Sequence, residues 1–170
     1  MSVTALYSAQ RAQAALRRDK RKAKAKRLGT AKPSLSKLKK TLWALLAPAI
    51  RQEFGPLCFT CGGNGNQTGH MFAKGRAHAL SAWHPDNLRP QCFYCNINMG
   101  GNGAEFGRRY VLAYGQEAFD RMAVASQTSH KWTAPEVEVL IDRMRQGLET
   151  YRAYYRAAYD AKKRLDSATS

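Results

Sequence analysis

Apolar side chains recur at helical spacing in the segment that precedes the first cysteine. The spacing predicts an amphipathic helix over residues 36–53, with Ser36 as its N-cap and a kink at Pro48. The helix should end at Gly55-Pro56. Its apolar face is formed by Leu38, Leu42, Leu45, Leu46 and Ile50.

Helical patterns return in the C-terminal third of the chain. Residues 104–114 and 116–125 predict two short helices that are separated by Gly115. Thr133-Ala-Pro-Glu136 is a capping box with an early proline, from which we expect one last helix to run to about Leu165. Its apolar stripe consists of Val137, Leu140, Ile141, Met144, Leu148, Tyr151 and Tyr155. Tyrosines 151, 154, 155 and 159 should pack within the protein rather than stack on bases.

Residues 57–103 have no long amphipathic period and differ in composition from the flanks. They hold all four cysteines, three of the four histidines and many glycines. We therefore expect an α+β protein, in which a small metal-organised module of short strands and turns is flanked by helices. The predicted division is a basic N-terminal arm (1–33, helical or disordered), an amphipathic helix (34–56), the metal-stabilised module (57–125) and a C-terminal helix (126–170).

Positive charge is concentrated at the N-terminus. The chain has 28 Lys+Arg and 12 Asp+Glu, a net charge of +16, and residues 1–40 hold 13 of the basic residues with Asp19 as their single acid. Such an arm favours a polyanion, with nucleic acid as the default partner. Residues 5–28 are good helix formers, which leaves a ligand-ordered helix and a frayed tail as alternatives. The segment 17–27 has too few large apolar residues for a membrane surface.

The compartment decides how the cysteines are interpreted. No apolar run approaches the ~18 residues of a membrane span, and the N-terminus lacks a basic stretch followed by an apolar one. We therefore expect a cytoplasmic protein without a membrane partner. In that compartment paired cysteines are typical of metal ligands rather than disulfides.

Two C-x2-C knuckles lie 30 residues apart, at Cys58–Cys61 and Cys92–Cys95. This spacing lets both thiolates of a knuckle reach one tetrahedral ion, and predicts a structural Zn²⁺ on all four cysteines. Four thiolates close the coordination sphere, so this zinc should stabilise the module rather than catalyse a reaction. The alternative, a pair of redox dithiols, lacks the βαβ pattern of such proteins.

The residues between and after the knuckles carry a resemblance to a known family. Cys58–Gly62, Gly69-His70, Asn87-Leu88, Gln91–Asn96 and Gly101-Asn102 together resemble the phage NinG (Rap) recombination endonucleases. Similarity extends over about residues 33–150. The family belongs to the HNH, or His-Me finger, nucleases with a treble-clef zinc scaffold. The resemblance implies a ββα-metal module and a metal-dependent endonuclease for branched DNA such as Holliday junctions and D-loops, in the cytoplasm of a bacterial host.

Site roles follow from the resemblance by position. His70 would be the general base that takes a proton from water, and Asn87 would orient that histidine or shape the hairpin. Asn96 would bind a catalytic Mg²⁺ or Mn²⁺, with Asp86, His84 or Asn102 as further candidates. Gly69 stands where many HNH enzymes have an acidic metal ligand. Mg²⁺ tolerates few protein ligands because it retains waters and binds substrate phosphate.

Other histidines and the basic residues have less specific roles. His78 and His84 are expected to be loop residues or phosphate contacts, and His130 to be structural. The predicted DNA contacts are Arg17, Arg18, Lys20, Arg21, Lys22, Lys24, Lys26, Arg27, Lys74, Arg76, Arg89, Arg108 and Arg109. A homodimer would place two sites across a branch.

Two other functions remain open on the sequence alone. The first is a non-catalytic zinc module that binds DNA or RNA, which Gly69 favours. The second is a recombination accessory that docks a protein partner through its C-terminal helix, Thr133–Leu165.

Overall fold

The computed structural model describes most of the chain, namely residues 16–20, 23–24, 32–73 and 79–168. The chain divides into two units, residues 1–34 and 35–170. In the first unit, residues 16–20 and 23–24 are helical with exposed side chains. The rest of the helix predicted over 5–28 lies outside the described residues.

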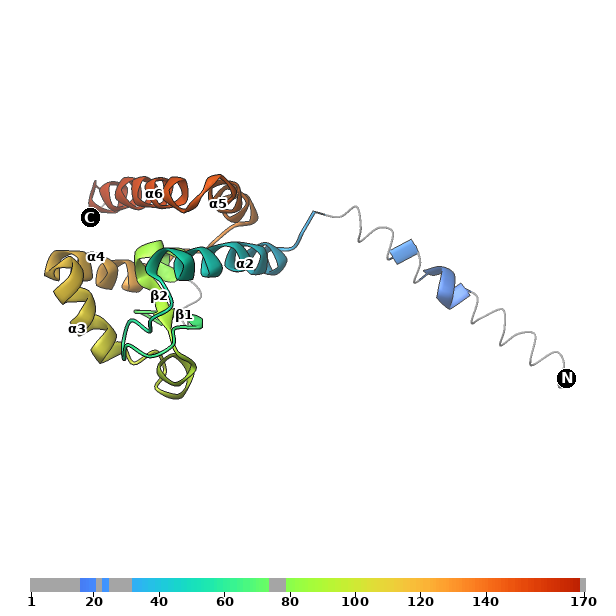
Figure 1. Ribbon diagram of the computed structural model, residues 1–170. Helices are drawn as coiled ribbons and strands as arrows, with labels where there is room; N and C mark the ends of the chain where they lie inside the picture. Colours follow the sequence, from blue (N-terminus) through green and yellow to red (C-terminus); the bar gives the residue numbers. More distant parts are fainter. Residues whose placement is uncertain (1–15, 21–22, 25–31, 74–78, 169–170) are drawn as a thin grey trace, which may run out of the picture. The chain divides into compact units, whose positions relative to one another are not determined.

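The second unit combines helices with one small sheet (Figure 1). This arrangement is α+β, although helices dominate it. The elements, in chain order, are α2 (Leu35–Phe54), β1 (Gln67–His70), η1 (Leu80–Trp83), η2 (Pro85–Asn87), β2 (Leu88–Gln91), η3 (Tyr94–Asn98), α3 (Gly103–Tyr114), α4 (Gln116–Gln127), α5 (Ala134–Gln146) and α6 (Leu148–Ala168).

Helix α2 confirms the predicted amphipathic helix. It stays helical through Pro48, and its buried residues include Leu38, Leu42, Leu46 and Ile50. This face packs against α5 and both strands of the sheet. The helix therefore joins the C-terminal segment to the strand that carries His70.

Strands β1 and β2 form an antiparallel pair in which His70 lies opposite Leu88 and Gly69 opposite Arg89. The connection between them carries the single-turn helices η1 and η2. Around the first cysteine knuckle, Leu57 and Asn64 form an isolated antiparallel bridge. The second knuckle begins directly after β2 and leads into the helical turn η3. These short elements place the candidate site.

The C-terminal segment differs from the prediction at one point. The expected single helix over 133–165 is wrong, because the chain breaks at Gly147 into α5 and α6. Gly147 has φ of 126°, which a residue with a side chain rarely adopts. The predicted start is confirmed: the Thr133 backbone N–H donates to the Glu136 carboxylate at 2.7 Å. Gly115, at φ 86°, separates α3 from α4 as predicted.

The apolar stripe of the C-terminal helices is buried within the unit. Tyr151 is fully buried and donates from its hydroxyl to the Trp83 carbonyl at 2.6 Å, and the Tyr155 hydroxyl donates to the Leu80 carbonyl. The packing predicted for Tyr151 and Tyr155 is thus confirmed. A partner-docking role for this stripe is not supported, since α2 and η1 already cover it. Among the described residues, no helix is both long and apolar enough to cross a membrane.

Candidate active site and metal centre

The four cysteines converge on one point, as the sequence predicts. Their sulfur atoms all lie within 4.8 Å of one another, and Cys61 Sγ lies 3.7 Å from Cys92 Sγ. Tetrahedral zinc with Zn–S bonds of about 2.3 Å requires sulfur separations of about 3.8 Å. The cluster therefore fits Zn²⁺ in both donor type and spacing.

Tight turns bring the sulfur atoms together. In the first knuckle the Cys58 N–H donates to the Gly63 carbonyl at 2.6 Å and the Gly62 N–H to the Cys58 carbonyl at 2.8 Å. Gly62 has φ of 78°, which explains glycine there. In the second knuckle the Cys95 N–H points to Cys92 Sγ at 3.3 Å, a backbone contact suited to a thiolate.

The two thiols of the first knuckle have opposite pKa shifts. Burial raises the pKa of Cys58, but hydrogen bonds from the Thr60 hydroxyl and from backbone N–H groups outweigh it and lower this pKa to about 6. The Gly63 N–H lowers the pKa of Cys61, but contacts with the other three thiols raise it to about 12.

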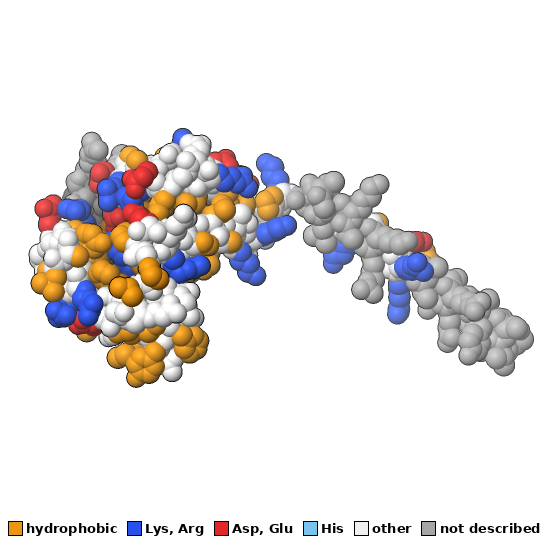
Figure 2. Space-filling model, viewed as in Figure 1, with side chains coloured by type: hydrophobic (Ala, Val, Ile, Leu, Met, Phe, Trp, Pro, Cys, Tyr) orange, Lys and Arg blue, Asp and Glu red, His pale blue; other side chains and the backbone are white. Residues whose placement is uncertain are grey.

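One edge of the cysteine cluster faces solvent. Cys61 is exposed, as are Phe93 and Tyr94 between the second pair. Figure 2 shows hydrophobic side chains gathered at the lower edge of this unit. A metal in the cluster would therefore be within reach of a chelator.

His70 ends strand β1 and is held on two sides. Its Nε2 lies 3.2 Å from the Ala82 carbonyl oxygen of η1. The indole of Trp43, from α2, stacks on the imidazole with ring centroids 5.3 Å apart and planes 12° apart. A carbonyl can only accept, so this bond places a proton on Nε2 and leaves Nδ1 as the nitrogen that carries a lone pair in the neutral ring.

Asn87 shapes the connection between the strands. It is fully buried; its Oδ1 accepts from the Phe72 N–H at 2.9 Å, and its Nδ2 donates to the Phe72 carbonyl and the Ser81 carbonyl, both at 3.1 Å. Asn87 therefore fixes Ser81, the residue before the carbonyl partner Ala82, and Phe72, two residues after His70. Of its two predicted roles, these bonds fit shaping the hairpin.

Gly69 has a packing reason to be glycine. A Cβ at this position would lie 1.7 Å from Oε1 of Gln91. Gln91 is fully buried, and its Nε2 donates to the Gly101 carbonyl at 2.8 Å. Any side chain at position 69, acidic or not, would displace Gln91. The absence of an acidic ligand here thus follows from the fold and does not by itself indicate a degenerate site.

Asn96 contacts β1 on the face opposite the His70 imidazole. Its Nδ2 donates to Gln67 Oε1 at 2.7 Å, which leaves Oδ1 as its acceptor. Gln67 and His70 are three residues apart in the strand, so their side chains leave it on opposite faces. The structure therefore places Asn87 against the connection that follows His70, but it does not place Asn96 on the side of β1 that carries the imidazole. Asn102, also a predicted ligand, has its Nδ2 4.0 Å from Cys95 Sγ.

Arg89 is not a surface residue. Only 2% of it is exposed, and its guanidinium carbon lies 4.1 Å from the Phe54 ring centroid and 4.6 Å from that of Tyr114. The predicted phosphate contact is therefore wrong for Arg89, which packs between aromatic rings as a cation–π residue.

The other predicted DNA contacts fall into three groups. Arg108 and Arg109 both pair with Glu105, at 2.8 and 2.7 Å. In the arm, four are described and exposed, namely Arg17, Arg18, Lys20 and Lys24. The remainder, Arg21, Lys22, Lys26, Arg27, Lys74 and Arg76, lie outside the described residues, as does His78.

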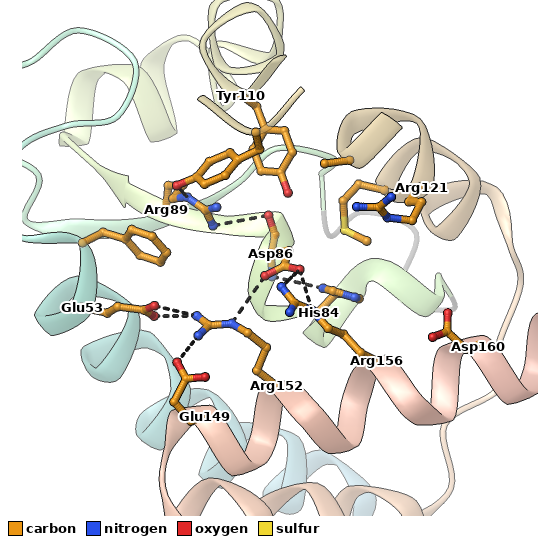
Figure 3. Close-up of a pocket in the computed structure, with 14 residues that line it drawn as sticks. Glu53, His84, Asp86, Arg89, Tyr110, Arg121, Glu149, Arg152, Arg156 and Asp160 are labelled. Atoms are coloured by element: carbon orange, nitrogen blue, oxygen red, sulfur yellow. Dashed lines mark hydrogen bonds and ion pairs between the residues drawn. The ribbon is translucent and has the colours of Figure 1, made fainter. Parts of the chain in front are cut away.

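A cavity of about 710 Å³ contains the other candidate metal ligands (Figure 3). There Asp86 pairs with Arg156 at 2.8 Å and Arg152 at 3.5 Å, and Arg152 also pairs with Glu53 at 2.7 Å. Asp86 therefore balances arginines of α6, and this network ties α6 to α2 and η2. It does not support Asp86 as a ligand of a catalytic ion.

His84 borders the same cavity and is buried. It is 2% exposed, its ring is edge-on to Tyr155, and its Nδ1 accepts from the Asp86 N–H at 3.1 Å. Burial lowers its pKa to about 4, against the smaller raising effect of Asp86. The predicted phosphate contact or metal role is thus not supported for His84. His130, by contrast, pairs with Glu136 at 3.0 Å beside the start of α5, in line with its structural interpretation.

Sequence reasoning missed the roles of Trp43 and Gln91. Trp43 lies three residues before Leu46 and seven before Ile50, so it borders the predicted apolar face, and the local pattern could not show its contact with His70. Gln91 immediately precedes the second knuckle, but its packing on Gly69 depends on strand pairing. A tryptophan at the border of the apolar face of an otherwise regular helix is the signal that could have been followed.

The arrangement defines a small α+β protein with a zinc-type cysteine cluster and a histidine presented on an adjacent β-hairpin. The family model of the bacteriophage lambda NinG protein matches residues 3–153. The chain therefore belongs to the NinG family, a family of phage proteins. No curated protein and no solved structure matches it.

Proposed function

We propose that this protein is a DNA endonuclease of phage recombination that cuts branched intermediates, such as Holliday junctions and D-loops, with His70 as general base. The observation that carries the proposal is the bond from His70 Nε2 to the Ala82 carbonyl at 3.2 Å. It fixes the tautomer in which Nδ1 holds the lone pair, the form that a general base needs. Membership of the NinG family supports the same chemistry.

The proposed reaction is hydrolysis of a phosphodiester. His70 Nδ1 takes a proton from water as the water oxygen attacks phosphorus. The bond from phosphorus to the 3′ oxygen breaks, and that oxygen leaves with a proton from solvent, which gives a 5′-phosphate and a 3′-hydroxyl. Trp43 and Ala82 hold the imidazole in place, and Asn87 holds the loop that carries Ala82.

Zn²⁺ at the four cysteines would be structural. The first knuckle lies on a tight hairpin and the second at the start of a helical turn, an arrangement that supports a treble-clef module. The zinc would join Cys58 and Cys61 to Cys92 and Cys95, and thereby anchor β2 beside β1. His70 would then stand on a strand whose partner is tied to the metal cluster.

The proposal includes one Mg²⁺ or Mn²⁺, but protein residues alone do not fit such an ion. Among the described residues, the cysteines are the one group of three or more His, Cys, Asp or Glu side chains that could hold a metal. Asn96, the predicted ligand, bonds to Gln67 on the face of β1 opposite the imidazole, so an ion beside His70 would take its ligands from water and substrate phosphate. When bound there, the ion would supply charge stabilisation at the scissile phosphate.

A non-catalytic zinc module that binds DNA or RNA is the second candidate. The lack of a carboxylate cluster beside His70, among the residues that the structure describes, favours it. It predicts DNA binding without cleavage in any divalent metal.

The test is cleavage of an end-labelled four-way junction and a matched duplex, with Mg²⁺, Mn²⁺ or neither. We expect metal-dependent cuts at the junction, lost in His70→Ala while DNA binding is retained. His130→Ala is the matched control, because that histidine lies beside α5 and should leave cleavage unchanged. Paired symmetric cuts would support a homodimer. Binding without cuts by the wild type would favour the second candidate.

A further inference from the structure

A hollow of about 560 Å³ lies between the start of α2 and η1. Its apolar walls include Leu35, Trp43, Ala82 and Trp83, and two cationic side chains, Lys39 and Lys40, complete it. None of the described residues that line it is acidic. The hollow therefore combines flat apolar surfaces with two positive charges and no negative charge among its described lining residues.

Two of its walls are the residues that hold His70. Trp43 stacks on the imidazole, and Ala82 supplies the carbonyl that bonds to Nε2. Trp43 is partly exposed, whereas Trp83 is 2% and Trp132 7% exposed. A ligand in the hollow would therefore contact the indole of Trp43, which is the ring that positions His70, the candidate general base.

The occupant that matches this chemistry is an aromatic ring with an attached anion. A nucleobase stacks on apolar and indole surfaces, and the phosphates beside it would meet the ammonium groups of Lys39 and Lys40. A paired base inside a duplex cannot enter, because it is stacked on both faces and hydrogen-bonded to its partner base. An apolar peptide segment would make no use of the two lysines.

We propose that this hollow is a subsite for an unpaired nucleobase of single-stranded or branched DNA. This inference rests on the proposed function, because it places the unpaired nucleobase next to the phosphate that His70 would attack with water. It gives a physical reason for preferring branch points, where bases are unpaired, over continuous duplex.

The binding test compares two oligonucleotides of equal length and charge, without Mg²⁺ or Mn²⁺. One is a hexamer of thymidylate, and the other has an abasic residue at a central position. We expect the wild type to bind the first at least about five-fold more tightly, the lower bound for one stacked base. Ala44→Trp should remove this preference, because Ala44 is an exposed lining residue whose enlargement fills the hollow. Ala113→Trp, at an exposed alanine of α3, should retain it.

A second readout does not depend on filling the hollow. The thymidylate hexamer should quench tryptophan fluorescence more than the abasic hexamer does, and Trp43→Phe should abolish that difference. Equal affinity and equal quenching for the two oligonucleotides would overturn the subsite, as would a preference that survives in Ala44→Trp.

The outcomes separate the subsite from the nuclease. If no DNA is cleaved but the base preference is lost in Ala44→Trp, the subsite stands and the nuclease fails. If His70→Ala abolishes cleavage but Ala44→Trp keeps the base preference, the nuclease stands and the subsite fails.

Discussion

Replacing Gly69 with alanine should destabilise the protein, because Gln91 fills the space that the methyl group would take. The added Cβ would lie 1.7 Å from Gln91 Oε1 and 2.6 Å from its Cδ. At an ordinary strand position, the same change stabilises by about 0.5–1 kcal/mol. The sign of the effect therefore distinguishes the packing explanation of Gly69 from a position that has merely lost an acidic ligand.

The magnitude follows from what holds Gln91. Its side chain is fully buried, and its Nε2 donates to the Gly101 carbonyl at 2.8 Å and to Thr60 Oγ1 at 3.3 Å. Displacing it leaves buried polar groups unsatisfied, at about 1–3 kcal/mol, and overpacking costs about 1–3 kcal/mol more. After the ordinary gain of about 0.5–1 kcal/mol is subtracted, we expect the free energy of unfolding to fall by about 1–5.5 kcal/mol in Gly69→Ala.

A double-mutant cycle with Gln91→Ala, measured by urea unfolding of zinc-loaded protein, tests this reasoning. The double variant should be more stable than the sum of the single losses by about 1–3 kcal/mol, since removing Gln91 removes the clash. Gly103→Ala is the control, because a Cβ there meets no atom within 4 Å. Strict additivity, or a neutral Gly69→Ala, would refute the packing explanation.

Three further predictions concern the metal, the buried histidine and the arm. The purified protein should contain one zinc per chain by elemental analysis, and Cys58→Ser should lose it with a large drop in Tm; an unchanged Tm would contradict a structural metal. The folded state keeps His84 neutral down to a pKa of about 4, from an ordinary value of 6.5. The unfolded state therefore binds a proton first, and stability should fall by about 3 kcal/mol as pH drops from about 6.5 to 4. His84→Asn should make the free energy of unfolding less dependent on pH in this range. An equally steep dependence in the variant would show that another group takes up the proton. Replacing Arg17, Arg18, Lys20 and Lys24 with glutamine should make the salt dependence of DNA binding shallower, by about 0.9 in log–log slope for each phosphate that the arm no longer neutralises. An unchanged slope would remove the arm from the interface.

Elements with a strong local pattern could be predicted from the sequence. Helix α2 and the start of α5 follow from apolar period and capping residues, which act within a few positions. The break at Gly147 could not, because the apolar stripe continues across it through Leu148 and Tyr151. Only the backbone angle at that glycine separates one long helix from two.

The candidate site was partly predictable for a similar reason. The cysteine spacing predicts the cluster, since two knuckles need one shared ion. Arg89 and His84 could not be placed, because nothing local distinguishes a solvated charge from one enclosed by rings or by a helix contributed from far along the chain. The stack of Trp43 on His70 likewise joins residues 27 positions apart.

Chemical rescue of His70→Ala by imidazole tests the central claim most directly. On a four-way junction, His70→Ala should lose cleavage, and added imidazole should restore part of the rate by entering the space beside Trp43. The restored rate should rise with the concentration of neutral imidazole, because the base must hold a lone pair. Cleavage by His70→Ala at the wild-type rate without imidazole would contradict a general-base role for His70.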